Sequence, residues 1–162
     1  MKTRNKKRLY IAYGSNLNLE QMALRCPTAK PVGAGKIEGY ALVFRGGVAN
    51  IEPSETSDVP ALVWDIRPDD EAALDRYEGY PTLYIKRDIE VETDREIVTA
   101  MAYVMARGIA PAMPSRAYYE TIRRGYEDAG FDETVLEDAL DLTERLMAQE
   151  WDQKRGGMEW GW

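Results

Sequence analysis

One glutamate lies where helices seldom carry an acid. The segment LDRYEGYPTLY places Glu78 at the carboxyl end of a predicted helix, beside Tyr77, Tyr80 and Tyr84. The helix dipole is negative there and the tyrosines add apolar bulk, so the pKa of this carboxyl should rise. The chain has no histidine, so proton transfer near neutral pH falls to such a carboxylate, a lysine or a tyrosine. Glu78 is a candidate general acid/base; an exposed glutamate at a frayed helix end is the alternative.

A second candidate is the turn that follows the first apolar run, YIAYGSNLN. In Tyr13, Gly14, Ser15, Asn16 and Leu17, a glycine lets the chain turn sharply before a helix begins. Backbone N–H groups of such a turn point outward together, which suits an anion. A positive φ is expected at Gly14, because glycine adopts it freely. An ordinary turn is the alternative.

Composition excludes several classes of chemistry. Without histidine, neither a Ser-His-Asp nor a Cys-His pair can operate, and the usual zinc sites lose a main ligand. The one cysteine, Cys26, is expected to be a small buried residue rather than a nucleophile. A net charge of −7 disfavours nucleic acid as the main partner. No apolar run is long enough to span a membrane, so we expect a cytoplasmic protein.

Hydrophobic periodicity predicts the elements that must position these residues. Strands are expected at 9–13, 37–44, 48–51, 61–66, 83–91 and 96–105, with a polar loop at 53–58. Helices are expected after Asn18, from Pro68 to Gly79, from Ser115 to Gly130 and from Asp132 onward. Strands fill the centre and helices the end, without regular βαβ alternation. This order predicts an α+β fold with a curled or closed mixed sheet.

Five segments, in order along the chain, resemble the γ-glutamylcyclotransferase-like family. They are YIAYGSNLN with RCP after it, LVFRGGVANIEPS, PALVWDI, LDRYEGYPTLY and APAMPSRAYYETIRRGYEDAGF. They extend from about Leu9 to Phe131. The YGSN tetrapeptide is the family's hallmark, and five segments in order are far more specific than it alone. The resemblance implies a small mixed β-barrel flanked by helices, with the site at the barrel mouth.

The resemblance also implies roles for individual residues. The YGSNL loop would hold a γ-glutamyl group and Glu78 would carry the proton. Tyr84 would orient Glu78, and Tyr118 would line the pocket. Tyr103 and the Gly46-Gly47 turn are further candidates for its wall. The implied reaction needs neither metal nor organic cofactor.

That reaction releases 5-oxoproline when the substrate's own α-amine attacks its γ-carbonyl. The substrate would be a γ-glutamyl amino acid or amine. A γ-glutamylamine of the isopeptide type, or a γ-glutamylated secondary metabolite, is the alternative within this chemistry. A non-catalytic small-molecule-binding module on the same barrel is the alternative of another class.

Three regions are expected along the chain. Residues 1–8 form a basic tail, residues 9–150 a single domain, and residues 151–162 a tail rich in tryptophan and glycine. Gly156 and Gly157 should make the last region flexible. Its tryptophans would pack on their own domain or insert into a neighbour, so the protein is expected to be a monomer or a homodimer.

Overall fold

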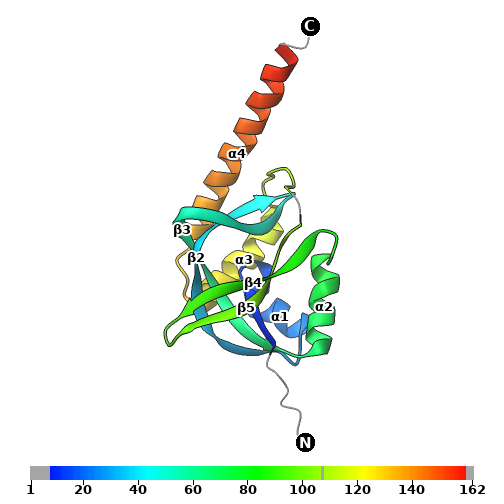
Figure 1. Ribbon diagram of the computed structural model, residues 1–162, viewed down its shortest axis with the longest axis vertical. Coiled ribbons are helices and arrows are strands. Elements are labelled where there is room, and N and C mark those ends of the chain that lie inside the picture. The colour runs from blue at the N-terminus through cyan, green and yellow to red at the C-terminus, as the bar shows by residue number, and fades with distance from the viewer. Residues whose placement is uncertain (1–7, 107, 160–162) are drawn as a thin grey trace, which may run out of the picture.

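The computed structural model describes residues 8–106 and 108–159, which form a β-barrel with helices around it (Figure 1). Its elements are β1 (Arg8–Ala12), the 3₁₀ turn η1 (Ser15–Leu17), α1 (Leu19–Arg25), β2 (Lys30–Arg45), β3 (Val48–Ile66), α2 (Pro68–Glu78), β4 (Tyr84–Thr93), β5 (Ile97–Met105), α3 (Arg116–Ala129) and α4 (Thr134–Glu159). Most of the predicted basic tail, residues 1–7, lies outside the described residues. Among those described, no helix combines the length and apolar character needed to cross a bilayer.

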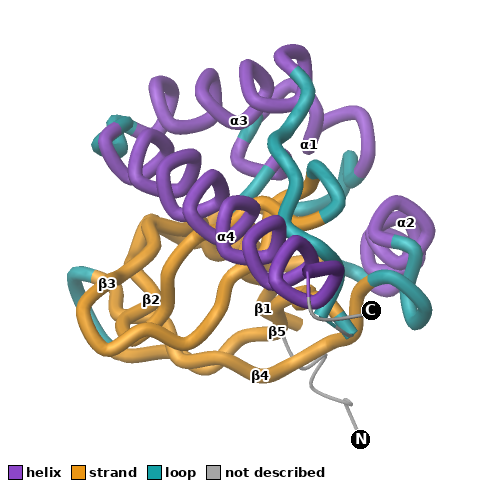
Figure 2. The backbone as a smooth tube through the Cα atoms, turned by 90° about the horizontal axis from the view of Figure 1, so that it is seen from above, coloured by secondary structure: helices purple, strands orange, loops and turns teal. Residues whose placement is uncertain are grey.

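The strands close into a barrel in the order β1-β3-β2-β4-β5. Four of the pairings are antiparallel. The fifth closes the barrel by pairing β1 in parallel with β5, Tyr10 facing Met101. Seen from above, α1, α3 and α4 lie over one side of the barrel and α2 lies at its flank (Figure 2). The predicted α+β fold with a small mixed barrel is therefore confirmed.

The β2–β3 hairpin is much longer than the sequence indicated. Gly46 and Gly47 form its two-residue turn with φ of 60° and 83°, the left-handed conformation that such a turn requires. The polar loop predicted at 53–58 is wrong, because this segment belongs to β3. Pro53 pairs with Tyr40 and Asp58 with Glu38, across a bulge. Polar side chains are compatible with a strand here because the ribbon extends into solvent, and the bulge increases its bend.

The predicted starts of α1 and α3 are confirmed. The Asn18 side chain caps α1 by accepting a hydrogen bond from the Gln21 N–H, and Ser115 caps α3 in the same way through the Tyr118 N–H. Such a cap is worth about 1 kcal/mol. Both caps satisfy donors that would otherwise have no partner.

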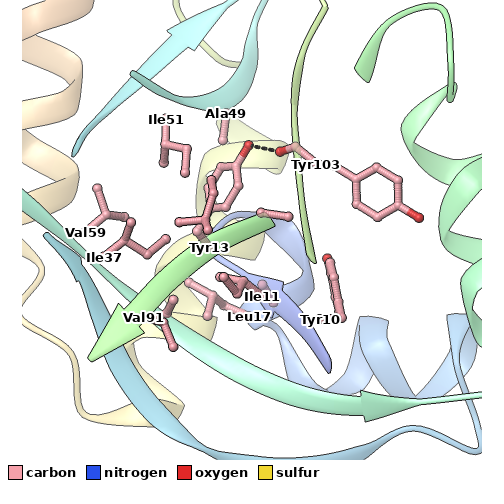
Figure 3. Packing of buried hydrophobic residues seen from close by; sticks show 14 of the residues in the cluster. Tyr10, Ile11, Tyr13, Leu17, Ile37, Ala49, Ile51, Val59, Val91 and Tyr103 are labelled. Carbon is pink, nitrogen blue, oxygen red and sulfur yellow. Dashed lines mark hydrogen bonds between the residues drawn. The ribbon is translucent and has the colours of Figure 1, made fainter. Parts of the chain in front are cut away.

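The barrel interior and the strand that leads into the YGSN turn share one core. Ile11 of β1 and Tyr13, just after the strand, lie among aliphatic residues of β2, β3 and β4 (Figure 3). The Tyr13 hydroxyl donates a hydrogen bond of 2.5 Å to the Tyr103 carbonyl of β5. Because this bond and the surrounding packing hold both sides of Tyr13, the turn after it begins from a fixed position.

Helix α4 docks on the barrel with its first turns only. Leu136 is buried, and the buried Thr143 hydroxyl accepts a hydrogen bond from the Phe44 N–H of β2. The helix then extends away from the barrel (Figure 1) and continues to Glu159. The helix therefore passes through residue 151, where a separate tail with a flexible Gly156-Gly157 segment is expected from the sequence. Trp151 is 65% exposed, so it does not pack on its own domain; residues 160–162, including Trp160 and Trp162, lie outside the described residues.

Candidate active site

A cavity of about 260 Å³ lies at the barrel mouth, where the turn after β1 faces the end of α2. Its lining comes from distant parts of the chain: Tyr10, Ile11, Tyr13, Gly14, Ser15, Asn16, Val48, Ala49, Tyr77, Glu78, Leu83, Tyr84, Tyr103 and Tyr118. The cavity thus brings together the predicted acid, four residues of the predicted loop and three of the predicted tyrosines. A second hollow, of about 500 Å³ between α4 and the β2–β3 hairpin, contains none of them.

Glu78 is the last residue of α2, as the sequence indicated. Gly79 follows it with φ of 63° and ends the helix in the left-handed conformation, which glycine adopts at little cost. Although Glu78 keeps some exposed surface, it lines the cavity, and burial raises the pKa of its carboxyl from 4.5 to about 7 against the opposing effect of Arg25. A carboxyl with this pKa can both accept and donate a proton near neutral pH.

The YGSN turn lines the same cavity as Glu78. Ser15–Leu17 form a 3₁₀ turn in which the Leu17 N–H binds the Gly14 carbonyl at 3.0 Å. The first N–H groups of such a turn have no acceptor within it, so those of Ser15 and Asn16 are available to a ligand. Gly14 has φ of −120°, so the positive φ expected from the sequence is wrong. Glycine is needed there for space, since an added Cβ would lie 3.3 Å from the Ala49 Cβ.

The polar side chains of the turn are held by tyrosines. The hydroxyls of Ser15 and Tyr77 are 2.7 Å apart, which links the turn to the end of α2. The Asn16 amide donates to the Tyr10 hydroxyl at 2.8 Å. These contacts fix the turn relative to both the barrel and the helix that carries Glu78.

Tyr84 and Tyr118 meet at Ala49, near the start of β3, rather than at Glu78. The Tyr84 hydroxyl donates to the Ala49 carbonyl at 2.5 Å, and the Tyr118 hydroxyl accepts from the Ala49 N–H at 3.0 Å. Burial raises the pKa of both hydroxyls, so both stay neutral. Tyr84 therefore lines the same cavity as Glu78, but its hydroxyl is bonded to the Ala49 backbone rather than to Glu78.

One expected loop residue and two expected wall residues lie outside the cavity lining. Leu17 is fully buried in the core and is absent from the cavity lining, and its N–H is already bonded within the turn. Gly46 and Gly47 form the hairpin turn, and Val48 and Ala49 after them line the cavity instead. Tyr103, in contrast, does line the cavity, and its hydroxyl donates to Asp75 at 2.5 Å.

Sequence reasoning missed Arg25 and Tyr10, and it gave Tyr77 only apolar bulk and a hydroxyl group near Glu78. Arg25 lies at the end of α1, and its guanidinium carbon is 3.4 Å from the centre of the Tyr77 ring. It is the one cation in the short α1 sequence LEQMALR, and that was the only signal available. Tyr77 is distant from Arg25 in sequence, so their meeting could not be inferred.

The remaining candidate for chemistry was Cys26. It is buried as expected, its thiol donates to the Asp70 carbonyl at 3.6 Å, and burial raises its pKa to about 11. The thiolate needed for nucleophilic attack is therefore disfavoured. Within residues 8–106 and 108–159, no group of three or more His, Cys, Asp or Glu side chains is placed to hold a metal ion.

Comparison with solved structures identifies the fold. A structure described as "Gamma-glutamyl cyclotransferase" superposes with a TM-score of 0.71 at 27% identity, covering 88% of this chain and 88% of that one. YkqA from Bacillus subtilis, at 18% identity, has a TM-score of 0.68 over 89% of this chain and 55% of its own. The second likeness shows the fold alone. The small closed barrel with a cavity at its mouth is thus the γ-glutamyl cyclotransferase fold.

Sequence comparison gives the family. The family model described as "Gamma-glutamyl cyclotransferase, AIG2-like" matches residues 10–125. The gamma-glutamylcyclotransferase of Mus musculus is 30% identical over 142 residues, which cover 80% of this chain and 75% of the mouse protein. That of Homo sapiens is 29% identical over 155 residues, covering 88% and 78%. The chain belongs to the γ-glutamyl cyclotransferase, AIG2-like family, a family of enzymes.

Proposed function

We propose that this protein releases 5-oxoproline from a γ-glutamyl amino acid or amine, with Glu78 as general acid/base. The observation that carries the proposal is a carboxyl with a pKa of about 7 in a cavity that also contains the YGSN turn. An acid with this pKa is useful to an enzyme and of no use to a module that only binds.

Binding would place the γ-glutamyl group in the cavity in a curled conformation. The N–H groups of Ser15 and Asn16 would donate to the substrate's α-carboxylate or to the oxyanion that develops on the γ-carbonyl. Because the amine and the carbonyl belong to one molecule, holding this conformer is itself worth several kcal/mol. The tyrosine hydroxyls of the wall stay neutral and provide shape without competing as bases.

Glu78 would then move the protons. As a carboxylate it takes a proton from the substrate's α-ammonium group, and the freed amine attacks the γ-carbonyl. A new C–N bond closes the five-membered lactam and the original amide C–N bond breaks, while Glu78 donates its proton to the departing nitrogen. The two protons that leave the attacking nitrogen can both end on the departing one. The carboxyl returns to its starting state and no co-reactant is consumed.

A comparison of two substrates identifies the class of amine that the enzyme would release. The segment YEGYPTLYIKR resembles the γ-glutamylamine branch, whereas PSRAYYETIRRGYEDAGF resembles the γ-glutamyl-amino-acid branch. We favour the second. Release of 5-oxoproline from γ-Glu-Ala and from γ-Glu-ε-Lys, measured side by side, separates the two branches. Faster release from γ-Glu-ε-Lys would reverse this preference.

The proposal is tested by Glu78→Gln. This variant keeps the size of the side chain and should lose at least about 10²-fold in turnover. The matched control is Glu20→Gln, since Glu20 is exposed on α1 and away from the cavity; it should retain wild-type turnover. Near-full activity of Glu78→Gln would refute the role of Glu78. Thermal stabilisation by the γ-glutamyl compounds without any product from the wild-type protein would favour the non-catalytic binding module.

A further inference from the structure

Arg25 occupies a position between the two halves of the candidate site. Its Nη1 donates a hydrogen bond to the Asn16 Oδ1 on the YGSN turn. Its guanidinium lies over the Tyr77 ring, with 3.4 Å between the guanidinium carbon and the ring centre. Tyr77 immediately precedes Glu78 in α2, so one side chain contacts both the turn and the helix end.

The contacts form a closed ring. Arg25 joins Asn16 to Tyr77, and the Tyr77 hydroxyl returns to the turn through the Ser15 hydroxyl at 2.7 Å. This ring of contacts meets the YGSN turn at two adjacent residues, Ser15 and Asn16. The planar guanidinium is the side chain that suits this geometry, because it can hydrogen-bond along its edge while stacking on an aromatic face.

We propose that Arg25 is a positioning residue, which holds the end of α2 against the YGSN turn and so fixes the separation between Glu78 and the turn's free N–H groups. The inference rests on the proposed function, since it assigns Arg25 to the same site. Arg25 does not line the cavity, so it acts through Asn16 and Tyr77 rather than on the substrate.

The charge of Arg25 adds a second effect on Glu78. Five groups interact electrostatically with the Glu78 carboxyl: Arg25 from α1, Tyr10 from β1, Tyr13 just after β1, Tyr84 from β4 and Tyr118 from α3. The tyrosines are neutral, because burial raises their pKa values. Among the described residues that face Glu78, Arg25 therefore supplies the positive charge, which opposes the rise in the carboxyl's pKa that burial causes. Without that charge, more of Glu78 would be protonated at neutral pH and unable to accept the ammonium proton.

The test compares three variants by two readouts. Arg25→Gln removes both the charge and the stacking, and Arg25→Lys keeps the charge but loses the planar fork. Arg76→Gln is the matched control, because Arg76 is an exposed cation on α2 and lies outside the cavity lining. The first readout is the pKa of Glu78, measured by NMR of its carboxyl carbon. The second is the pH profile of kcat for 5-oxoproline release.

The expected results differ between the variants. Arg25→Gln should raise the pKa of Glu78 by about one pH unit and lower kcat about tenfold at pH values below that pKa. Arg25→Lys should restore the pKa while kcat stays reduced severalfold, because the helix end is no longer held. Arg76→Gln should match the wild type in both. An Arg25→Gln protein that keeps both its Glu78 pKa and its kcat within twofold of the wild type would overturn the inference.

Two further outcomes keep the two proposals separable. If Arg25→Gln does not fold, Arg25→Lys decides alone: full kcat would overturn the positioning role, and a reduced kcat with an unchanged Glu78 pKa would support it. If the wild type forms no 5-oxoproline, the proposed function fails, whereas the NMR titration still shows whether Arg25 controls Glu78. An unchanged pKa in Arg25→Gln would then overturn the proposed influence of Arg25 on Glu78.

Discussion

Replacing Glu78 by glutamine should stabilise the protein, and the gain should depend on pH. Burial raises the pKa of the Glu78 carboxyl from 4.5 to about 7 in the folded state. Below pH 4.5 the carboxyl is protonated in both the folded and the unfolded chain, so it imposes no cost. Between pH 4.5 and 7 the unfolded chain releases the proton that the folded chain retains, and stability falls. Above pH 7 the cost is complete.

The size of this cost follows from the same pKa difference. Each pH unit between the folded and unfolded pKa values corresponds to about 1.4 kcal/mol, so Glu78 costs about 3 kcal/mol of folding free energy above pH 7. Glutamine does not ionise and escapes this cost. For a chain of this size, about 3 kcal/mol corresponds to about 6–12 °C in Tm. The glutamine variant should therefore melt near the wild type at pH 4 and clearly above it at pH 8.

The assay is thermal unfolding of both proteins at a series of pH values from 4 to 8. Glu71→Gln on the same helix is the control with the opposite sign. Although burial alone would raise the pKa of Glu71, hydrogen bonds from Arg8 and Lys86 hold it below the ordinary value. Its loss should destabilise the protein at pH 8 and less so at pH 4. A Tm difference between Glu78→Gln and the wild type that does not change with pH would refute the reasoning, because the carboxyl would then be as well solvated when folded as when unfolded.

Three other substitutions test the cavity and the packing around the YGSN turn. Gly14→Val should raise KM severalfold in the 5-oxoproline assay, because even a Cβ there lies 3.3 Å from the Ala49 Cβ; an unchanged KM would count against a substrate-holding turn. Gly125→Ala should lower both Tm and kcat, since its Cβ would come within 2.6 Å of the Leu17 backbone and push α3 off the turn; a wild-type Tm would contradict this close packing. Tyr118→Phe should cost about 1 kcal/mol in denaturant unfolding, because the buried Ala49 N–H loses its acceptor; no loss would mean that another group replaces the hydroxyl.

The prediction of a polar loop at 53–58 failed for a physical reason. The segment 53–58 is polar and contains a proline, which is typical of a loop. Its strand conformation comes from pairing with β2, where Tyr40 faces Pro53 and Glu38 faces Asp58. Strand formation depends on a partner elsewhere in the chain, so polarity alone misassigns a ribbon that extends into solvent.

The sequence alone determined the features that depend on near neighbours. The cap at Asn18, the helix end at Gly79 and the place of Glu78 in the last turn of α2 all arise from contacts within a few residues. Local steric and hydrogen-bonding preferences are enough to establish such features. The order of the motifs was also sufficient to indicate the family.

Only the tertiary structure decided what surrounds Glu78. Arg25 meets Tyr77 across more than fifty residues of sequence, and Tyr84 and Tyr118 meet at Ala49 from different elements. Closure of the barrel brings these groups together, and the same closure removes water from the carboxyl. The sequence could suggest the direction of the pKa change from the helix end, but desolvation, the larger cause, exists only once distant segments pack around the acid.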